Sequence, residues 1–290
     1  MHCKRGFIMD EIRIDDLKVF ARHGVFPEEN EKGQNFYINA KLEMSLRKAG
    51  LTDELGASVS YAEVCGIISE EMQKHTFKLI EAAAEHLICV LMKRFESIKA
   101  ISIEIRKPEA PIDLEFSSVS VCLRRRRHNA YIAIGSNDDY PEKNESSEEL
   151  VEDAIRMLDE DPECRVLFRS SMIKTKPYGG VATKEFINGA FILETLYEPE
   201  ALLDKIHEIE NACGRIRKER WGDRTLDMDI IYFDNEVIDL PNLTVPHRDM
   251  ANRDFVLAPL CEIAPDFIHP VLRKTNRELL EEVKEKCIII

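Results

Sequence analysis

The chain has 290 residues, 44% of them hydrophobic, and a formal net charge of −14 at pH 7. This length suits two domains better than one, and the acidic balance argues against nonspecific binding to nucleic acid. The N-terminus lacks a signal-peptide core, and no apolar run approaches the length of a membrane span. The eight cysteines are scattered without CxxC spacing, which is typical of reduced thiols in a cytoplasmic protein.

Two helix starts in the first half of the chain carry polar side chains. Ser60 and Glu63 have the spacing of a capping box, which predicts a helix that begins at Tyr61 and leaves that phenol at the end of an element. Glu81 opens a second, amphipathic helix, whose inward residues are Ile80, Ala84, Leu87 and Leu91.

Lys107 is predicted to leave a strand in an extended conformation, because Pro108 follows it and disfavours a helix. The alternative is an ordinary surface lysine. The four histidines of this half, at positions 23, 75, 86 and 128, show no zinc-ligand spacing.

The domain boundary is predicted near the basic run RRRRHN, residues 124–129. Residues 1–128 carry 20 basic and 20 acidic side chains, whereas the remainder carries 20 and 34, so the whole net charge belongs to the second half. The run lies between strand-like stretches, which favours a short charged connector over a nucleic-acid-binding or nuclear-import signal. We predict domains at residues 9–123 and 129–290.

The second half alternates strands and helices. Ser146 and Glu149 form a capping box that starts one helix. We expect strands at residues 130–135, 165–174, 187–194 and 225–233, and a second helix at residues 198–213. This alternation with local connections predicts a two-layer α/β sandwich of ferredoxin-like type.

The most informative stretch is GRIRKERWGDRTLDMDII, residues 214–231, which places five cations beside Asp227 and Asp229. In a strand these two carboxylates project from one face, which suits Mg²⁺ with water and phosphate as its other ligands. Arginines can bind phosphate oxygens bidentately. A DxD strand alone is more often a solvated face, and an arginine-rich turn is usually surface. The joint pattern predicts a site for Mg²⁺ and a nucleotide polyphosphate.

A P-loop kinase is excluded, since GxxxxGK[ST] occurs nowhere in the chain. Charge on the phosphates must then be neutralised by arginine, histidine and metal. The segment LTVPHRDMANRDFVLAPL, residues 243–260, adds His247, Arg248 and Arg253 to the cationic set.

These motifs, with YIAIGSN, TKPYGG and EFINGAF upstream, resemble the 6-hydroxymethyl-7,8-dihydropterin pyrophosphokinase family from about residue 129 to near the C-terminus. Two departures are visible. The family usually has proline where Asp223 stands, which we expect to adjust the loop. The stretch from Arg217 to Arg220 is one residue short, which leaves open which cation contacts which phosphate.

The resemblance implies ATP as co-substrate and a role for each matching residue. Two Mg²⁺ ions would be held by Asp227 and Asp229. The catalytic arginines would be Arg215 and Arg224. The nucleotide would be contacted by Glu210, Arg217, Trp221, His247 and Arg253, with Trp221 closing over the site on a loop. The pterin would be bound by Thr175, Tyr178, Phe186, Asn188 and Phe255, with the two phenylalanines on either side of the ring. Taken alone, each of these phenylalanines is more often a core residue than one that stacks on a ligand.

In the first half, HGVFPEENEKGQNF, VSYAEV, KLIEAAAEHL and IRKPEAPI together resemble the dihydroneopterin aldolase family over nearly the whole unit. The resemblance implies a tunnel fold (T-fold), assembly into rings with eight copies as the implied number, and no cofactor. Lys107 would be the main acid/base, Tyr61 would protonate the enol and Glu29 would orient the lysine. Glu81 would accept the paired donors of the pterin; alternatively it is a first-turn glutamate favoured by the helix dipole.

The two resemblances imply consecutive steps of folate biosynthesis on pterin substrates. Dihydroneopterin is cleaved to 6-hydroxymethyl-7,8-dihydropterin and glycolaldehyde, and ATP then pyrophosphorylates that alcohol with release of AMP. One alternative keeps the pyrophosphokinase and makes the first domain a pterin-binding oligomerisation module. Another is a non-enzymatic pterin- or nucleotide-binding scaffold. We expect neither a nucleic-acid nor a membrane partner.

Overall fold

The computed structural model describes residues 9–140, 145–176, 184–215 and 223–283. The chain separates into two compact units, Met1–Arg127 and His128–Ile290, each with its own internal contacts. In the part of the chain that the structure describes, no helix has both the length and the apolar character needed to cross a membrane.

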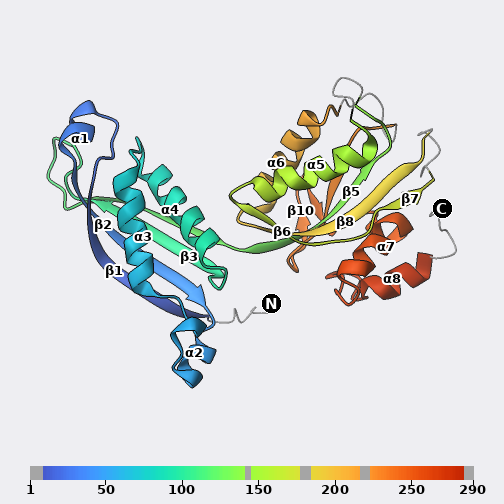
Figure 1. The fold of residues 1–290 in the computed structure, drawn as a ribbon, viewed down its shortest axis with the longest axis horizontal. Coiled ribbons are helices and arrows are strands. Elements are labelled where there is room, and N and C mark those ends of the chain that lie inside the picture. Colours follow the sequence, from blue (N-terminus) through green and yellow to red (C-terminus); the bar gives the residue numbers. More distant parts are fainter. Residues whose placement is uncertain (1–8, 141–144, 177–183, 216–222, 284–290) are drawn as a thin grey trace. The chain divides into compact units, whose positions relative to one another are not determined.

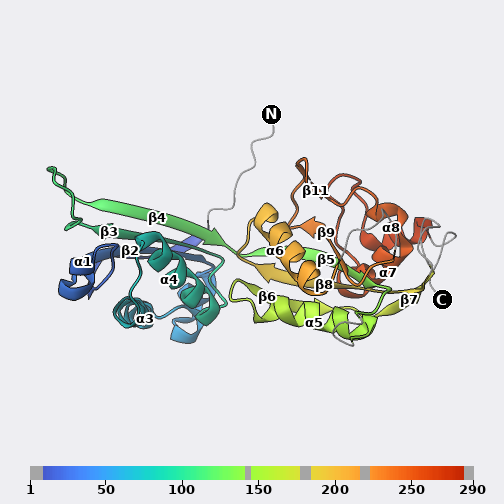
Figure 2. The ribbon, with the colours of Figure 1, turned by 90° about the horizontal axis from the view of Figure 1, so that it is seen from above.

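The first unit is an antiparallel sheet with two long helices on one face (Figure 2). The strands follow the order β1-β2-β3-β4. They are β1 (Asp10–Ala21), β2 (Gln34–Met44), β3 (Ala100–Lys107) and β4 (Val119–Arg126). The long helices are α3 (Tyr61–Lys74) and α4 (Ile80–Arg94). Short helical segments are α1 (Pro27–Lys32), α2 (Arg47–Thr52) and a 3₁₀ turn at Leu55–Ala57.

The local sequence explains both long helices. The Ser60 hydroxyl accepts a hydrogen bond from the Glu63 N–H at 3.3 Å, so α3 begins at Tyr61 as predicted. The apolar residues predicted for the second helix, with Leu87 among them, are buried along α4. Strand β2 alternates buried and half-buried residues, since only one of its faces meets the helices.

The basic run between the units is largely strand, which corrects the expectation of a connector. Arg124 and Arg126 pair with Ser102 and Ala100 in the last rungs between β3 and β4. Arg125 forms a bidentate ion pair with Glu85 at 2.6 and 3.0 Å. Backbone pairing and carboxylate partners from its own unit therefore account for the run.

The second unit begins with the element order β-α-β-β-β-α-β, which is the predicted ferredoxin-like order once its divided second strand is counted as one. Its antiparallel sheet has the order β6-β8-β5-β9, with β7 also paired to β8. The strands are β5 (His128–Ser136), β6 (Cys164–Arg169), β7 (Ile173–Thr175), β8 (Phe186–Thr195) and β9 (Asp227–Phe233). The single strand expected at residues 165–174 is two strands, because the ladder is interrupted between β6 and β7.

Helices cover both faces of this sheet, and the central strand β8 is buried along its whole length (Figure 1). One face packs against α5 (Ser147–Glu160), which has the predicted capping box, and α6 (Pro199–Ala212). The other packs against α7 (Asp254–Ile263) and α8 (Asn276–Val283). The third layer was not predicted from the sequence. Short pieces β10 (Ile238–Asp239), β11 (Thr244–Val245) and a 3₁₀ turn at Met250–Asn252 lie between β9 and α7.

Candidate active sites

The aspartate pair lies on β9, and the strand alternation places it as predicted. Met228 and Ile230 are buried on the face of the sheet that packs against α5 and α6. Asp227 and Asp229 project together from the other face of the strand and are half-buried. Both aspartates line two neighbouring pockets. The pair is therefore not a solvated face, and it lies where the two pockets adjoin.

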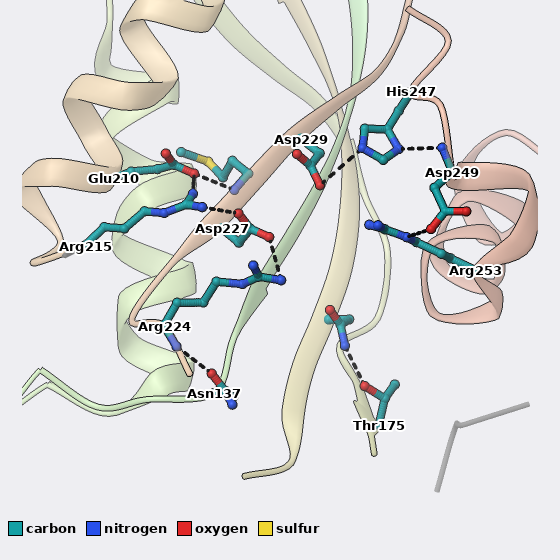
Figure 3. A network of polar contacts seen from close by, with 12 residues as sticks. Asn137, Thr175, Glu210, Arg215, Arg224, Asp227, Asp229, His247, Asp249 and Arg253 are labelled. Carbon is teal, nitrogen blue, oxygen red and sulfur yellow. Dashed lines mark hydrogen bonds and ion pairs between the residues drawn. The ribbon is translucent and has the colours of Figure 1, made fainter. Parts of the chain in front are cut away.

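Two arginines form ion pairs with Asp227 from different sides (Figure 3). Arg215 Nη2 lies 2.8 Å from Oδ1 and Arg224 Nη2 lies 2.9 Å from Oδ2. Glu210 fixes Arg215 through an ion pair and also accepts a hydrogen bond from the Met228 N–H at 2.9 Å. Glu210 thus ties helix α6 and the segment after it to β9.

The electrostatics of this cluster favour a further positive charge. Burial raises the pKa of Glu210 to about 7, although Arg215 opposes the shift. Burial and the adjacent Asp229 carboxylate raise the pKa of Asp227, despite its two arginine partners. A cation bound between Asp227 and Asp229 would relieve their mutual repulsion, so the pair fits a divalent metal.

The first pocket has the composition expected for a flat heterocycle. It is a partly open pocket with both apolar and polar side chains in its lining. Phe186 and Phe255 both line it, so the two aromatics predicted to hold the pterin share one cavity. The guanidinium of Arg224 lies 5.5 Å from the centre of the Phe186 ring, and that of Arg253 lies 5.8 Å from the Phe255 ring.

One end of this pocket is polar. Asn188 Nδ2 donates a hydrogen bond to Thr175 Oγ1 at 2.7 Å, so the two predicted pterin ligands are joined. A side chain at Gly135 would place its Cβ 2.6 Å from Asn188 Oδ1. The glycine of the YIAIGSN motif is therefore needed for the close approach of the amide.

The second pocket is more polar and encloses about 910 Å³ including its open side. His247 lines it, with Nε2 4.0 Å from Asp229 Oδ2. Asp249, for which no role was predicted, holds two of the predicted residues in place. Its N–H donates to His247 Nδ1 at 3.3 Å, and its carboxylate accepts from Arg253 Nε at 2.8 Å (Figure 3). The signal in the sequence is the i, i+4 spacing of Asp249 and Arg253.

Asn137, the last residue of the YIAIGSN motif, also has a role that the sequence did not indicate. Its Oδ1 accepts a hydrogen bond from the Arg224 N–H at 2.8 Å. Its Nδ2 donates to Asp223 Oδ1 at 2.6 Å, and the same oxygen lies 3.5 Å from the Lys184 backbone N–H. The aspartate that departs from the family pattern thus ties the end of β5 to the segments leading into β8 and β9.

Three predicted kinase residues, Tyr178, Arg217 and Trp221, lie outside the described residues, as does the shortened arginine stretch. Besides the two aspartates, the other nine predicted residues of this unit border one or both pockets: Thr175, Phe186, Asn188, Glu210, Arg215, Arg224, His247, Arg253 and Phe255.

In the first unit the structure brings Lys107 and Glu29 together. Lys107 ends β3, as predicted, and its ammonium donates to Glu29 Oε1 in an ion pair whose side chains are only 11% and 8% exposed. The surface-lysine alternative is therefore wrong. The other oxygen, Oε2, accepts the Phe26 N–H at 3.1 Å, and Gln34 Nε2 donates to Oε1 at 3.3 Å. Burial alone would raise the pKa of Glu29, but these hydrogen bonds, led by that of Lys107, lower it.

A glycine and a histidine lie beside the Lys107–Glu29 pair. A Cβ on Gly24 would lie 2.2 Å from Glu29 Oε2, so only glycine lets the chain pass this carboxylate. His23 is fully buried, and its Nδ1 accepts the Phe77 N–H at 3.1 Å. Burial, with the charge of Lys107 adding to it, lowers the pKa of His23 to about 4. The ring is therefore neutral beside the lysine at physiological pH.

Within one chain, Tyr61 and Glu81 lie outside the Lys107–Glu29 ion pair. Tyr61 is 66% exposed at the start of α3, and Glu81 is exposed at the start of α4. Among the residues the structure describes, no hydrogen bond or ion pair connects either of them to Lys107 or Glu29.

Comparisons with known proteins agree with both units. Residues 12–124 match the family model of dihydroneopterin aldolase, and residues 131–265 match that of 7,8-dihydro-6-hydroxymethylpterin-pyrophosphokinase. A 2-amino-4-hydroxy-6-hydroxymethyldihydropteridine pyrophosphokinase of Haemophilus influenzae is 41% identical over 53% of this chain and 89% of its own length.

A longer relative and a solved structure were also found. The folic acid synthesis protein FOL1 of Dictyostelium discoideum is 30% identical over 93% of this chain, which spans 44% of that protein. A crystal structure of E. coli dihydroneopterin aldolase in complex with neopterin is 27% identical, with a TM-score of 0.38, over 40% of this chain and 99% of that one. The chain belongs to the 7,8-dihydro-6-hydroxymethylpterin-pyrophosphokinase family and carries a dihydroneopterin aldolase domain ahead of that domain, which is the pairing of a bifunctional folate-synthesis enzyme.

Proposed function

We propose that the second unit transfers pyrophosphate from ATP to the hydroxymethyl group of a pterin through Asp227 and Asp229. The observation that carries the proposal is the position of this pair at the edge shared by the aromatic pocket and the polar pocket. The pterin occupies the pocket of Phe186 and Phe255, and the triphosphate lies on the side of His247. The hydroxyl oxygen of the pterin then attacks the β-phosphorus of ATP beside the aspartates, and AMP is the leaving group.

The two aspartates would hold two Mg²⁺ ions, which neutralise charge on the phosphate oxygens as they transfer. Because Arg215 and Arg224 already lie against Asp227, both guanidiniums are near the site of transfer without a rearrangement of the fold. Asp227 would hold a divalent cation in place of these ion pairs, which would leave Arg215 and Arg224 available to phosphate oxygens. Asn137 holds the backbone of Arg224, and Glu210 holds Arg215, which limits the entropy lost on binding.

For the first unit we propose a retro-aldol cleavage of dihydroneopterin in which the pterin C=N accepts the electrons. Such a substrate needs only proton transfers from the protein, without a Schiff base or a metal in the chemical step. Lys107 moves the proton, Glu29 orients its ammonium, Tyr61 protonates the enol and Glu81 accepts the pterin donors. The buried Lys107–Glu29 pair supports this assignment.

A coupled assay tests the whole proposal. Incubation with dihydroneopterin and Mg·ATP should yield glycolaldehyde and AMP, each measured separately. AMP formation from supplied 6-hydroxymethyl-7,8-dihydropterin without any glycolaldehyde from dihydroneopterin would favour the alternative in which the first unit only binds pterin and assembles. Formation of neither product would favour a binding scaffold.

We further propose that the aldolase pocket is completed by a neighbouring copy of the chain. Tyr61 and Glu81 are exposed at the starts of their helices, and neither contacts Lys107 within the described part of one chain. The sheet ends at β1 and β4, and no further strand among the described residues pairs with either edge. Pairing of such edges in a closed ring would protect them.

This arrangement predicts oligomers. The full chain and the isolated segment 9–123 should both form assemblies of at least four copies, with eight expected from the family resemblance, whereas segment 129–290 should be a monomer that still releases AMP. Light scattering on the three proteins measures this. A monomeric full chain with full aldolase activity would contradict the shared pocket.

A further inference from the structure

Two histidines and a glutamate converge in the aldolase unit, outside the Lys107–Glu29 pair. Glu71 lies in the last turn of α3, His75 caps the end of that helix, and His86 lies on α4. Glu71 Oε2 is 3.3 Å from His75 Nε2 and 2.5 Å from His86 Nε2. All three ligand atoms lie within 4.8 Å of one another. No step of the proposed reaction uses these side chains.

The two separations between the Glu71 carboxylate and the imidazoles are close to those of a tetrahedral metal site. With bonds of about 2.0–2.1 Å to zinc, neighbouring ligand atoms are about 3.3–3.4 Å apart. The Glu71–His75 distance already has that value, and the Glu71–His86 distance needs to open by about 1 Å, a small side-chain movement. One carboxylate with two imidazoles is also a ligand set that zinc takes in proteins, with water in the fourth position.

One side of the Glu71–His75–His86 cluster is accessible to solvent, and the other side packs against neighbouring residues. The side chain of Glu71 is 14% exposed, that of His86 30% and that of His75 41%, so water can reach the outer side. The Phe77 ring packs against both imidazoles, at centroid distances of 5.9 Å from His75 and 5.3 Å from His86. The nearby cation, Lys74, approaches the other carboxylate oxygen at 3.7 Å and leaves Oε2 to the histidines.

We propose that Glu71, His75 and His86 bind one divalent transition-metal ion of the zinc class. The ion joins the end of α3 to α4 across the segment that contains Phe77, whose backbone is hydrogen-bonded to Gly24 and to the His23 ring. It thereby stabilises the start of α4, where Glu81 lies, and takes no part in proton transfer by Lys107.

The test is zinc binding by the full-length chain in an Asp227→Asn, Asp229→Asn background, which removes the competing carboxylates of the kinase unit. Metal is first stripped with a chelator, and Zn²⁺ affinity is then measured by competition with a chromophoric chelator. The variants are Glu71→Gln and His75→Gln, and the matched control is Glu70→Gln, an exposed glutamate one residue away on the same helix. The His75 side chain is 41% exposed, so we expect His75→Gln to fold normally. This variant still tests the site if Glu71→Gln folds poorly.

We expect one Zn²⁺ per chain in the parent protein and in the control. Loss of a direct ligand should weaken binding by more than about 100-fold, because loss of mere outer-sphere partners already costs about 10–100-fold. Zn²⁺ should also raise the unfolding temperature of the parent and of the control, but not that of Glu71→Gln or His75→Gln. Equal affinity in all four proteins, or a Co²⁺ spectrum with a thiolate charge-transfer band that shows cysteine ligation, would overturn the proposal.

Discussion

Replacing Asp227 or Asp229 with alanine is expected to abolish AMP release while glycolaldehyde production stays near the wild-type rate. Each replacement removes a carboxylate from the edge shared by the two pockets of the kinase unit. Stabilisation of developing charge by a bound metal is worth several kcal/mol, and each 1.4 kcal/mol is about tenfold in rate. We therefore expect kcat for pyrophosphoryl transfer to fall by about 10³-fold or more, measured as AMP formed from 6-hydroxymethyl-7,8-dihydropterin and Mg·ATP.

A matched control is Asp239→Ala, which removes an exposed aspartate of the same unit. That variant should retain AMP release. The Asp227 variant leaves Arg215 and Arg224 without a shared carboxylate, so its folding should be checked by thermal unfolding. The Asp229 variant is measured beside it; that carboxylate lies 4.0 Å from His247 Nε2. If both variants kept most of the pyrophosphokinase activity, the metal assignment would be wrong.

Lys107→Met should remove aldolase activity and spare the pyrophosphokinase. General acid–base catalysis contributes about 10²–10⁴-fold, so kcat for glycolaldehyde formation should fall by a factor in that range. The replacement also leaves the Glu29 carboxylate buried without its cation, and breaking a buried pair typically costs about 3–5 kcal/mol of stability. Thermal unfolding must therefore accompany the kinetics, and Lys99→Met, an exposed lysine just before β3, serves as the control.

The double variant Glu29→Gln, Lys107→Met separates chemistry from folding, because it removes both buried charges together. It should recover part of the lost stability without recovering aldolase activity. Borohydride added during turnover of the wild-type enzyme should neither inactivate it nor label Lys107. A substrate-dependent borohydride adduct on any lysine would show a Schiff base and replace the proposed mechanism.

Much of the kinase site follows from local pattern. The alternation around Asp227 and Asp229 sufficed to place both carboxylates on one face of a strand, because side chains alternate in any strand whatever surrounds it. The Ser60 N-cap and the Ser146 capping box gave the starts of α3 and α5 for the same reason, since both depend on residues only three apart.

Contacts between distant segments were decided by the tertiary structure alone. Asn137 is hydrogen-bonded to Asp223 and to the backbone of Arg224, which lie more than 80 residues away in the sequence. No local sequence spacing predicts these contacts. The third layer of α7 and α8 could not be foreseen either, because a helix pattern does not say which face of a sheet it will cover.

The aldolase unit shows the same division. Lys107 and Glu29 were assigned to one site by resemblance, but their burial as an ion pair is a property of the fold, which brings together residues 78 positions apart. His75 and His86 have no zinc spacing in the chain, yet the packing of α3 and α4 places both beside Glu71. The sequence by itself determined the families, the main elements and most candidate residues. Side-chain convergence between elements was left to the tertiary structure, because periodicity and capping act over a few residues whereas a binding site is assembled from segments that only packing brings together.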